Sequence, residues 1–260
     1  MRHAVKERFR RPSQALHWSE FARAWLDWGS LQLAEPWLSA LPGGDGQPVL
    51  VIPGFTAGDR STSILRRFLT SLGYLPTGWK QGVNFGVRHE AFDGVTRLLE
   101  QLQREYGCRV SLVGQSLGGI YARELAKRNP ERVRQVITLG SPFNDPGGHA
   151  SNVTELYHLF NPGHASKAEQ IRREHWDIPA PPPVPTTAIF SRWDGVCHWR
   201  ACIQHGGHEQ VENIEVMASH TGMAVNPQAL FVIADRLAQR RATWTPFRFP
   251  RPFDPRTADR

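Results

Sequence analysis

Short runs of apolar residues alternate with longer amphipathic segments through the middle of the 260-residue chain. The runs 48–54, 108–114 and 133–140 are rich in β-branched residues and bounded by turn residues, which is typical of strands buried on both faces. The segments 59–73 and 89–107 carry apolar residues at helical spacing, and each ends in glycine. Repeated alternation of this kind requires crossover connections between parallel strands. The sequence therefore predicts an α/β fold, with a mostly parallel sheet of about six strands and helices on both faces.

The domain boundaries follow from where this alternation begins and ends. Residues 1–45 are expected to form an amphipathic helical segment packed on the core, and residues 46–244 a single α/β domain. Within it, the chain becomes irregular and rich in proline and glycine over about 144–184, which predicts a lid-like insertion. Two further strands and a capped helix follow this insertion. Residues 245–260 are expected to form a flexible tail.

Composition and charge narrow the classes of partner. The chain carries 31 Lys and Arg against 24 Asp and Glu, a formal net charge of +7. Much of the excess lies in the two terminal segments, and no basic stripe alternates with aromatic residues, so no nucleic-acid partner is expected. The start of the chain lacks the apolar core of a signal peptide, and its three cysteines are too few for a disulfide framework. Both features favour a cytoplasmic protein.

The N-terminal segment is rich in tryptophan. Apolar residues recur there at spacings of three to seven, which predicts one or two amphipathic helices. The stripe expected to pack on the domain consists of Leu16, Phe21, Trp25, Trp28, Leu31 and Leu38. Because tryptophan also favours the boundary between membrane and water, peripheral membrane contact or a dimer contact through this helix is the alternative. The sequence leaves the oligomeric state open.

The run Gly114-Gln115-Ser116-Leu117-Gly118 lies where a predicted buried strand meets a predicted helix. It matches G-x-S-x-G, a pattern that holds a serine on a sharp turn with its hydroxyl exposed at the carboxyl end of the strand. The flanking residues have to be small because the turn brings strand and helix close together. The sequence therefore indicates Ser116 as a nucleophile, the alternative being a purely structural turn.

A serine hydroxyl needs a base, normally a histidine oriented by a carboxylate. Asp194 follows the next-to-last predicted strand, and His220 follows the last one in a loop of small residues. Both positions resemble the α/β-hydrolase order, in which an acid and then a histidine follow the serine, each on a loop after a later strand. Asp145, after an earlier strand, is the alternative acid.

Acyl transfer also requires donors for the oxyanion of the tetrahedral intermediate. The backbone N–H of Leu117, directly after the serine, is the first candidate. The second is the N–H of Phe55, because Gly54 allows the loop after the first strand to turn toward the crevice. The alternative for this loop is a plain turn that ends the strand.

These motifs, in this order, resemble those of the α/β-hydrolase superfamily and of its bacterial lipases and esterases. The chain has PGF in the donor loop, GQSLGG at the serine, LGSP after the next strand, DGVC at the acid and SH at the base. It departs from the commoner DGVV at the acid and from the histidine that many lipases have in place of Pro53. The likeness covers about residues 48–239. It implies hydrolysis of a small-molecule or lipid ester through an acyl-enzyme.

Other functions use the same features. An acyltransferase or amidase would need the same three side chains, and a non-catalytic binding or scaffold protein could share the fold. The apolar residues of the insertion predict a lid over an apolar acyl pocket; they are Val153, Leu156, Tyr157, Leu159, Phe160 and Trp176.

A histidine- and cysteine-rich stretch follows the predicted acid. Its members are Cys197, His198, Cys202, His205 and His208. The cysteines are spaced C-x4-C rather than C-x2-C, the spacing of common zinc modules. No metal and no other cofactor are therefore expected.

Overall fold

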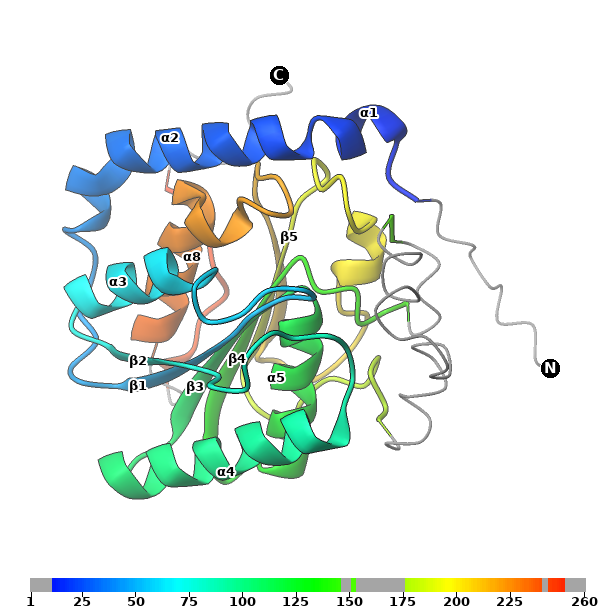
Figure 1. Ribbon diagram of the computed structural model, residues 1–260. Helices are drawn as coiled ribbons and strands as arrows, with labels where there is room; N and C mark the ends of the chain where they lie inside the picture. Colours follow the sequence, from blue (N-terminus) through cyan, green and yellow to red (C-terminus); the bar gives the residue numbers. More distant parts are fainter. Residues whose placement is uncertain (1–10, 146–150, 153–175, 240–242, 251–260) are drawn as a thin grey trace.

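The computed structural model describes residues 11–145, 151–152, 176–239 and 243–250 and contains one six-stranded sheet (Figure 1). The strand order is β2-β1-β3-β4-β5-β6, and every neighbouring pair is parallel. The strands are β1 (Pro48–Ile52), β2 (Leu75–Gly78), β3 (Val110–Gln115), β4 (Val133–Leu139), β5 (Thr186–Phe190) and β6 (Val211–Glu215). The predicted parallel α/β architecture is confirmed.

Helices cover both faces of the sheet, as predicted. Those described are α1 (Gln14–Trp18), α2 (Glu20–Leu38), α3 (Ser63–Ser71), α4 (His89–Tyr106), α5 (Leu117–Arg128) and α8 (Pro227–Ala238), with short 3-10 turns η1 (Trp199–Cys202) and η2 (Met223–Val225). α4 and α5 lie on one face, α3 and α8 on the other, and α2 packs across α8 and η2 (Figure 1).

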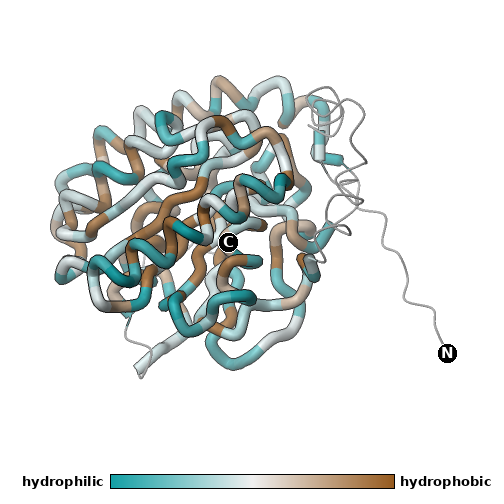
Figure 2. The backbone as a smooth tube through the Cα atoms, turned by 60° about the horizontal axis from the view of Figure 1, so that its bottom comes forward, coloured by the Kyte–Doolittle hydropathy of each residue, from teal (hydrophilic) through white to brown (hydrophobic). Residues whose placement is uncertain are grey.

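Side chains of the central strands alternate between two hydrophobic clusters. Val49 and Val51 pack with residues of α3 and α8, whereas Leu50 and Ile52 pack with residues of α4 and α5. Hydrophobic stretches accordingly run through the middle of the molecule in Figure 2. Burial on both faces explains why the strands read as continuous apolar runs in the sequence.

The N-terminal helix packs on the domain, but only part of the expected stripe faces it. Leu38 is buried and Leu31 is partly buried, whereas Phe21 and Trp25 of the predicted stripe are 75% and 69% exposed. The residues of α2 buried against the domain are Glu20, Asp27 and Leu38. The stripe was misassigned because the inward face of α2 carries two carboxylates. Over the described ranges, no helix is both long and apolar enough to cross a membrane.

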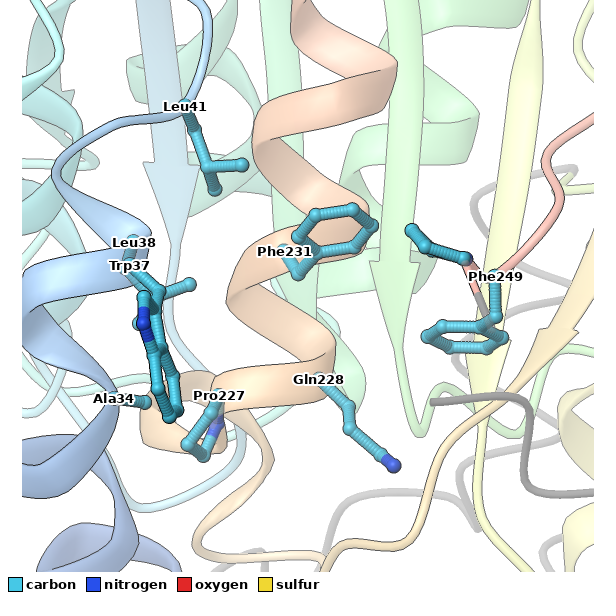
Figure 3. A pocket seen from close by; sticks show the side chains of 9 residues that line it. Ala34, Trp37, Leu38, Leu41, Pro227, Gln228, Phe231 and Phe249 are labelled. Atoms are coloured by element: carbon cyan, nitrogen blue, oxygen red, sulfur yellow. The ribbon is translucent and has the colours of Figure 1, made fainter. Parts of the chain in front are cut away.

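An apolar cavity of about 270 Å³ lies along the seam between α2 and α8. It is lined by Ala34, Trp37, Leu38, Leu41, Pro227, Gln228, Phe231, Phe249 and Pro250 (Figure 3). The C-terminal segment closes it from one side, where the Phe247 ring packs on Phe231 at 6.0 Å between centroids and on Phe249 at 4.7 Å. Within the predicted flexible tail, Phe247 and Phe249 therefore pack against the hydrophobic cluster of α8, and residues 251–260 lie outside the described residues.

Most of the predicted lid, including Val153 to Phe160, also lies outside the described residues. Trp176, from the same predicted set, is buried between Phe92 and Tyr121, with ring centroids at 5.1 and 5.2 Å. The indole therefore belongs to the hydrophobic cluster beneath α4 and α5 rather than to an exposed lid surface.

Candidate active site

Ser116 occupies the turn between β3 and α5 in a strained backbone conformation. Its φ is 50° and its ψ is −119°, a region that residues with a Cβ rarely adopt. The turn is fixed on both sides: the Ser116 N–H donates to the Leu139 carbonyl at 2.8 Å, and the Gly119 N–H donates to the Ser116 carbonyl at 3.0 Å. Strain held in this way is typical of functional turns.

The glycines around Ser116 are required by close packing of the backbone. A Cβ built on Gly118 would lie 2.2 Å from the Ile52 carbonyl oxygen, and one on Gly114 would lie 2.4 Å from the Gly118 carbonyl oxygen. A Cβ on Gly54 would lie 3.3 Å from the Ser116 Cβ. The end of β1, the loop that follows it and the serine turn are therefore in direct contact.

Both predicted oxyanion donors lie at this contact. Leu117 is the first residue of α5, so its N–H has no acceptor within the helix. Phe55 lies in the loop after β1, which is fixed on either side of it. The Thr56 N–H donates to the Asn84 carbonyl at 2.7 Å, and the Asn84 side-chain amide donates to the Pro53 carbonyl at 2.9 Å.

His220 and Asp194 form a buried pair. His220 Nδ1 lies 2.6 Å from Asp194 Oδ2, and the two residues are 8% and 3% exposed. The other carboxylate oxygen of Asp194 accepts hydrogen bonds from the N–H groups of Val196 and Cys197 at 2.8 and 2.7 Å. The loop after β5 thus orients the carboxylate toward the imidazole.

The surroundings of His220 change the pKa of its imidazole. Burial alone lowers the pKa of His220, but the charge and hydrogen bond of Asp194, with a smaller contribution from the charge of Glu20, outweigh burial. The pKa of His220 therefore lies above its ordinary value of 6.5.

One hydrogen bond joins this pair to the residue before Ser116, and the end of β4 packs against both members of the pair. The Gln115 side-chain amide donates to the His220 carbonyl at 3.0 Å. At the end of β4, a Cβ built on Gly140 would lie 3.1 Å from both Asp194 Oδ2 and His220 Nδ1. Among the described side chains, the ring of His220 bonds to Asp194, and no hydrogen bond joins it to Ser116.

The structure also distinguishes between the two candidate acids, Asp194 and Asp145. Asp145 is buried beyond the end of β4, but Nδ1 of His220 is already engaged by Asp194. The geometry therefore favours Asp194 over Asp145 as the partner of His220.

Comparison with known proteins identifies the fold. No protein-family model matches the sequence, and no curated protein matches it at a significant level. Many solved structures do. Aspergillus fumigatus lipase B superposes with a TM-score of 0.58 at 16% identity, covering 77% of this chain and 54% of the lipase. A structure from the metagenome-derived lipolytic enzymes LipS and LipT gives 0.56 at 16% identity, over 75% and 93%. Bacillus licheniformis lipase BlEst2 gives 0.54 at 13% identity, over 76% and 94%. The chain has the α/β-hydrolase fold.

The candidate residues occur in the chain order usual for an α/β-hydrolase. Ser116, Asp194 and His220 follow β3, β5 and β6 in turn, the order Ser, acid, His that this fold uses. β6 ends at Glu215, earlier than the sequence predicted, so His220 lies five residues beyond the strand in an irregular segment.

Sequence reasoning missed two residues at this α/β-hydrolase site. The carboxylates of Glu20 and Asp27 accept hydrogen bonds from backbone N–H groups next to Asp194 and His220. The available signal was a pair of acidic residues at helical spacing in a tryptophan-rich segment, but nothing in the local sequence indicates their partners.

The histidine- and cysteine-rich stretch is arranged without a ligand cluster. Cys197 and Cys202 are buried, and Cys202 ends η1. Within the described part of the chain, no group of three or more His, Cys, Asp or Glu side chains is arranged to hold a metal ion.

Proposed function

We propose that the protein is a serine hydrolase acting on carboxylic esters. One observation carries the proposal: a buried His220–Asp194 pair lies at the same edge of the sheet as a serine held at φ 50°. The named neighbours, two lipases and a lipolytic enzyme, support ester chemistry over other reactions of the fold.

In the proposed reaction, Ser116 Oγ attacks the ester carbonyl while His220 Nε2 accepts the hydroxyl proton. Asp194 holds Nδ1 and stabilises the imidazolium that forms. His220 then returns the proton to the departing alcohol, which leaves an acyl group on Ser116. Water, deprotonated by His220, attacks that acyl group and releases the acid.

The negative charge of the tetrahedral intermediate is proposed to be stabilised by the N–H groups of Phe55 and Leu117. The positive end of the α5 dipole lies at Leu117 and favours the same charge. Such donors are worth about 2.7–4 kcal/mol each in serine hydrolases. Because they are backbone groups, Pro53 in place of a histidine does not alter them.

The proposal is tested by labelling with a fluorophosphonate probe and by turnover of p-nitrophenyl esters. We expect the intact protein to be labelled and active, and Ser116→Ala to lose both properties. Absence of labelling in the intact protein would contradict the proposal and favour a binding protein on the same fold. Product analysis with added alcohol or amine separates hydrolysis from acyl transfer, since a transferase gives mainly the new ester or amide.

We further propose that the outward face of α2 contacts an anionic lipid surface. Its exposed apolar side chains are Trp18 from α1 and Phe21, Trp25, Leu26, Trp28, Leu33 and Trp37 from α2. Of the four charged residues of α2, Glu20 and Asp27 are buried, Arg23 donates to the Trp193 carbonyl, and Glu35 is exposed. Apolar side chains therefore dominate the outward face. Tryptophan favours the interfacial region of a bilayer, and the basic residues that precede α1 in the sequence, part of the net charge of +7, complement anionic headgroups.

A further inference from the structure

The inward face of α2 carries two carboxylates where a packed helix normally carries apolar residues. Glu20 is 3% exposed and Asp27 is 8% exposed. Burying a carboxylate is costly unless hydrogen bonds compensate for the lost water. The partners of these two groups therefore show what the burial achieves.

Glu20 connects the two loops that carry the His220–Asp194 pair. Its Oε2 accepts from the Gly195 N–H at 3.0 Å, and its Oε1 accepts from the Thr221 N–H at 2.8 Å. Gly195 directly follows Asp194, and Thr221 directly follows His220. One carboxylate thus fixes the distance between the residues next to the acid and next to the base.

Asp27 holds the other side of His220. Its Oδ2 accepts from the N–H and the hydroxyl of Ser219 at 2.9 and 2.6 Å, and its Oδ1 accepts from the side-chain amide of Asn226 at 2.7 Å. Ser219 directly precedes His220. The histidine is therefore flanked on both sides by residues bound to α2.

The helix lies so close to the two loops that there is no room for a side chain at Gly195 or at Gly222. A Cβ on Gly195 would lie 2.3 Å from the Leu16 carbonyl oxygen and 2.8 Å from Glu20 Oε2. A Cβ on Gly222 would lie 2.3 Å from Asp27 Oδ2. Glycine at these positions lets the helix and the loops approach to hydrogen-bonding distance.

We propose that Glu20 and Asp27 are positioning residues for the reaction, which hold the acid and histidine loops in register from the N-terminal helix. This inference rests on the proposed serine hydrolase function. Neither carboxylate touches the reacting atoms; each acts through the backbone beside Asp194 or His220. A displacement of about 1 Å in such a group costs up to about 100-fold in rate.

The test compares Glu20→Gln and Asp27→Asn with Glu35→Gln, an exposed carboxylate on the same helix. The amide side chain of each variant has one acceptor oxygen instead of two. Its NH₂ group would face backbone N–H donors, so some of the hydrogen bonds that the carboxylate accepts are lost. We expect kcat on a p-nitrophenyl ester to fall about 10- to 100-fold in both variants with KM little changed. Glu35→Gln is expected to match the unmodified protein. Rates are expressed per Ser116 titrated with fluorophosphonate, so misfolded material does not contribute.

A second readout separates positioning from simple destabilisation. The charged groups around His220 are Asp194 from the β5 loop and Glu20, Arg23 and Asp27 from α2. The negative charge of Glu20 raises the pKa of His220, so its removal lowers that pKa. Because catalysis requires neutral His220, the acid limb of kcat/KM moves to lower pH in Glu20→Gln. A general loss of stability would leave that limb in place.

Two results have different meanings. If the unmodified protein is neither labelled nor active, the proposed function itself fails. If it is labelled and active, but both variants retain its kcat per titrated site and its acid limb, the positioning role of α2 is overturned while the function stands.

Discussion

The two halves of the candidate site are fixed by different means. The half around Ser116 is held by backbone groups in contact, with the Gly118 position against the Ile52 carbonyl and the Gly54 position against Ser116. The half around His220 is held by side chains from α2, which lies 175 to 201 residues away along the chain. The comparison teaches that the turn at Ser116 is fixed by backbone contact with the end of β1, whereas the loop of the candidate base is held by side chains from a distant helix.

The largest expected effect concerns the His220 half. Asp194→Asn removes the carboxylate that orients His220, so we expect kcat for ester hydrolysis to fall about 10⁴-fold, as the corresponding substitution does in a serine protease. The matched control is Asp145→Asn, the alternative acid, which is expected to retain activity. Equal losses in both variants, or a loss in Asp145→Asn alone, would reverse the assignment of the acid. Steady-state kinetics on a p-nitrophenyl ester measures both.

An intermediate effect is expected in the Ser116 half. In Gly118→Ala the new methyl meets the Ile52 carbonyl at 2.2 Å, a backbone atom that cannot move aside cheaply. We expect the free energy of unfolding to fall by about 1–3 kcal/mol, measured by urea denaturation.

The control for the glycine variant is Gly29→Ala. Gly29 lies within α2 and its Cβ would meet no atom within 4 Å, so the alanine is expected to stabilise the helix by about 0.5–1 kcal/mol. If Gly118→Ala left the free energy of unfolding unchanged, the Ser116 turn would not be held by backbone contact. The difference between the Ser116 half and the His220 half of the site would then disappear.

The smallest effect concerns the outer face of α2. Replacing Trp18 and Trp25 by serine removes two rings that are 80% and 69% exposed, so folding should be unaffected. We expect sedimentation with phosphatidylserine-containing vesicles to weaken by about tenfold, from lost apolar burial. Val83→Ser, an exposed apolar side chain outside α2, serves as the control. Unchanged sedimentation, or a tryptophan-dependent dimer in analytical ultracentrifugation, would contradict lipid contact.

The contrast also explains which features could be predicted from the sequence. The strand runs and the Ser116 turn follow from local patterns, because burial on both faces and a steric requirement for glycine both leave marks in neighbouring residues. Asn226 could likewise be predicted as a cap, and it accepts from the N–H groups of Gln228 and Ala229.

The orientation of α2 could not be predicted in the same way. A helical stripe of tryptophans normally faces the core, and here buried Glu20 and Asp27 occupy that face instead. The two carboxylates face inward because they accept hydrogen bonds from N–H groups of loops near the other end of the chain. These hydrogen bonds join segments far apart in the sequence, so no pattern within α2 itself predicts them.

The hydrogen bonds of the α2 carboxylates can form only late in the synthesis of the chain. Loops that close over 175 to 201 residues require nearly the whole chain before their hydrogen bonds exist. The contacts of the Ser116 turn need only β1, β3, α5 and β4, whereas the contacts around His220 also need residues 219–226. In a nascent chain, the turn at Ser116 can therefore be complete about 80 residues before the loop that holds His220 has been made.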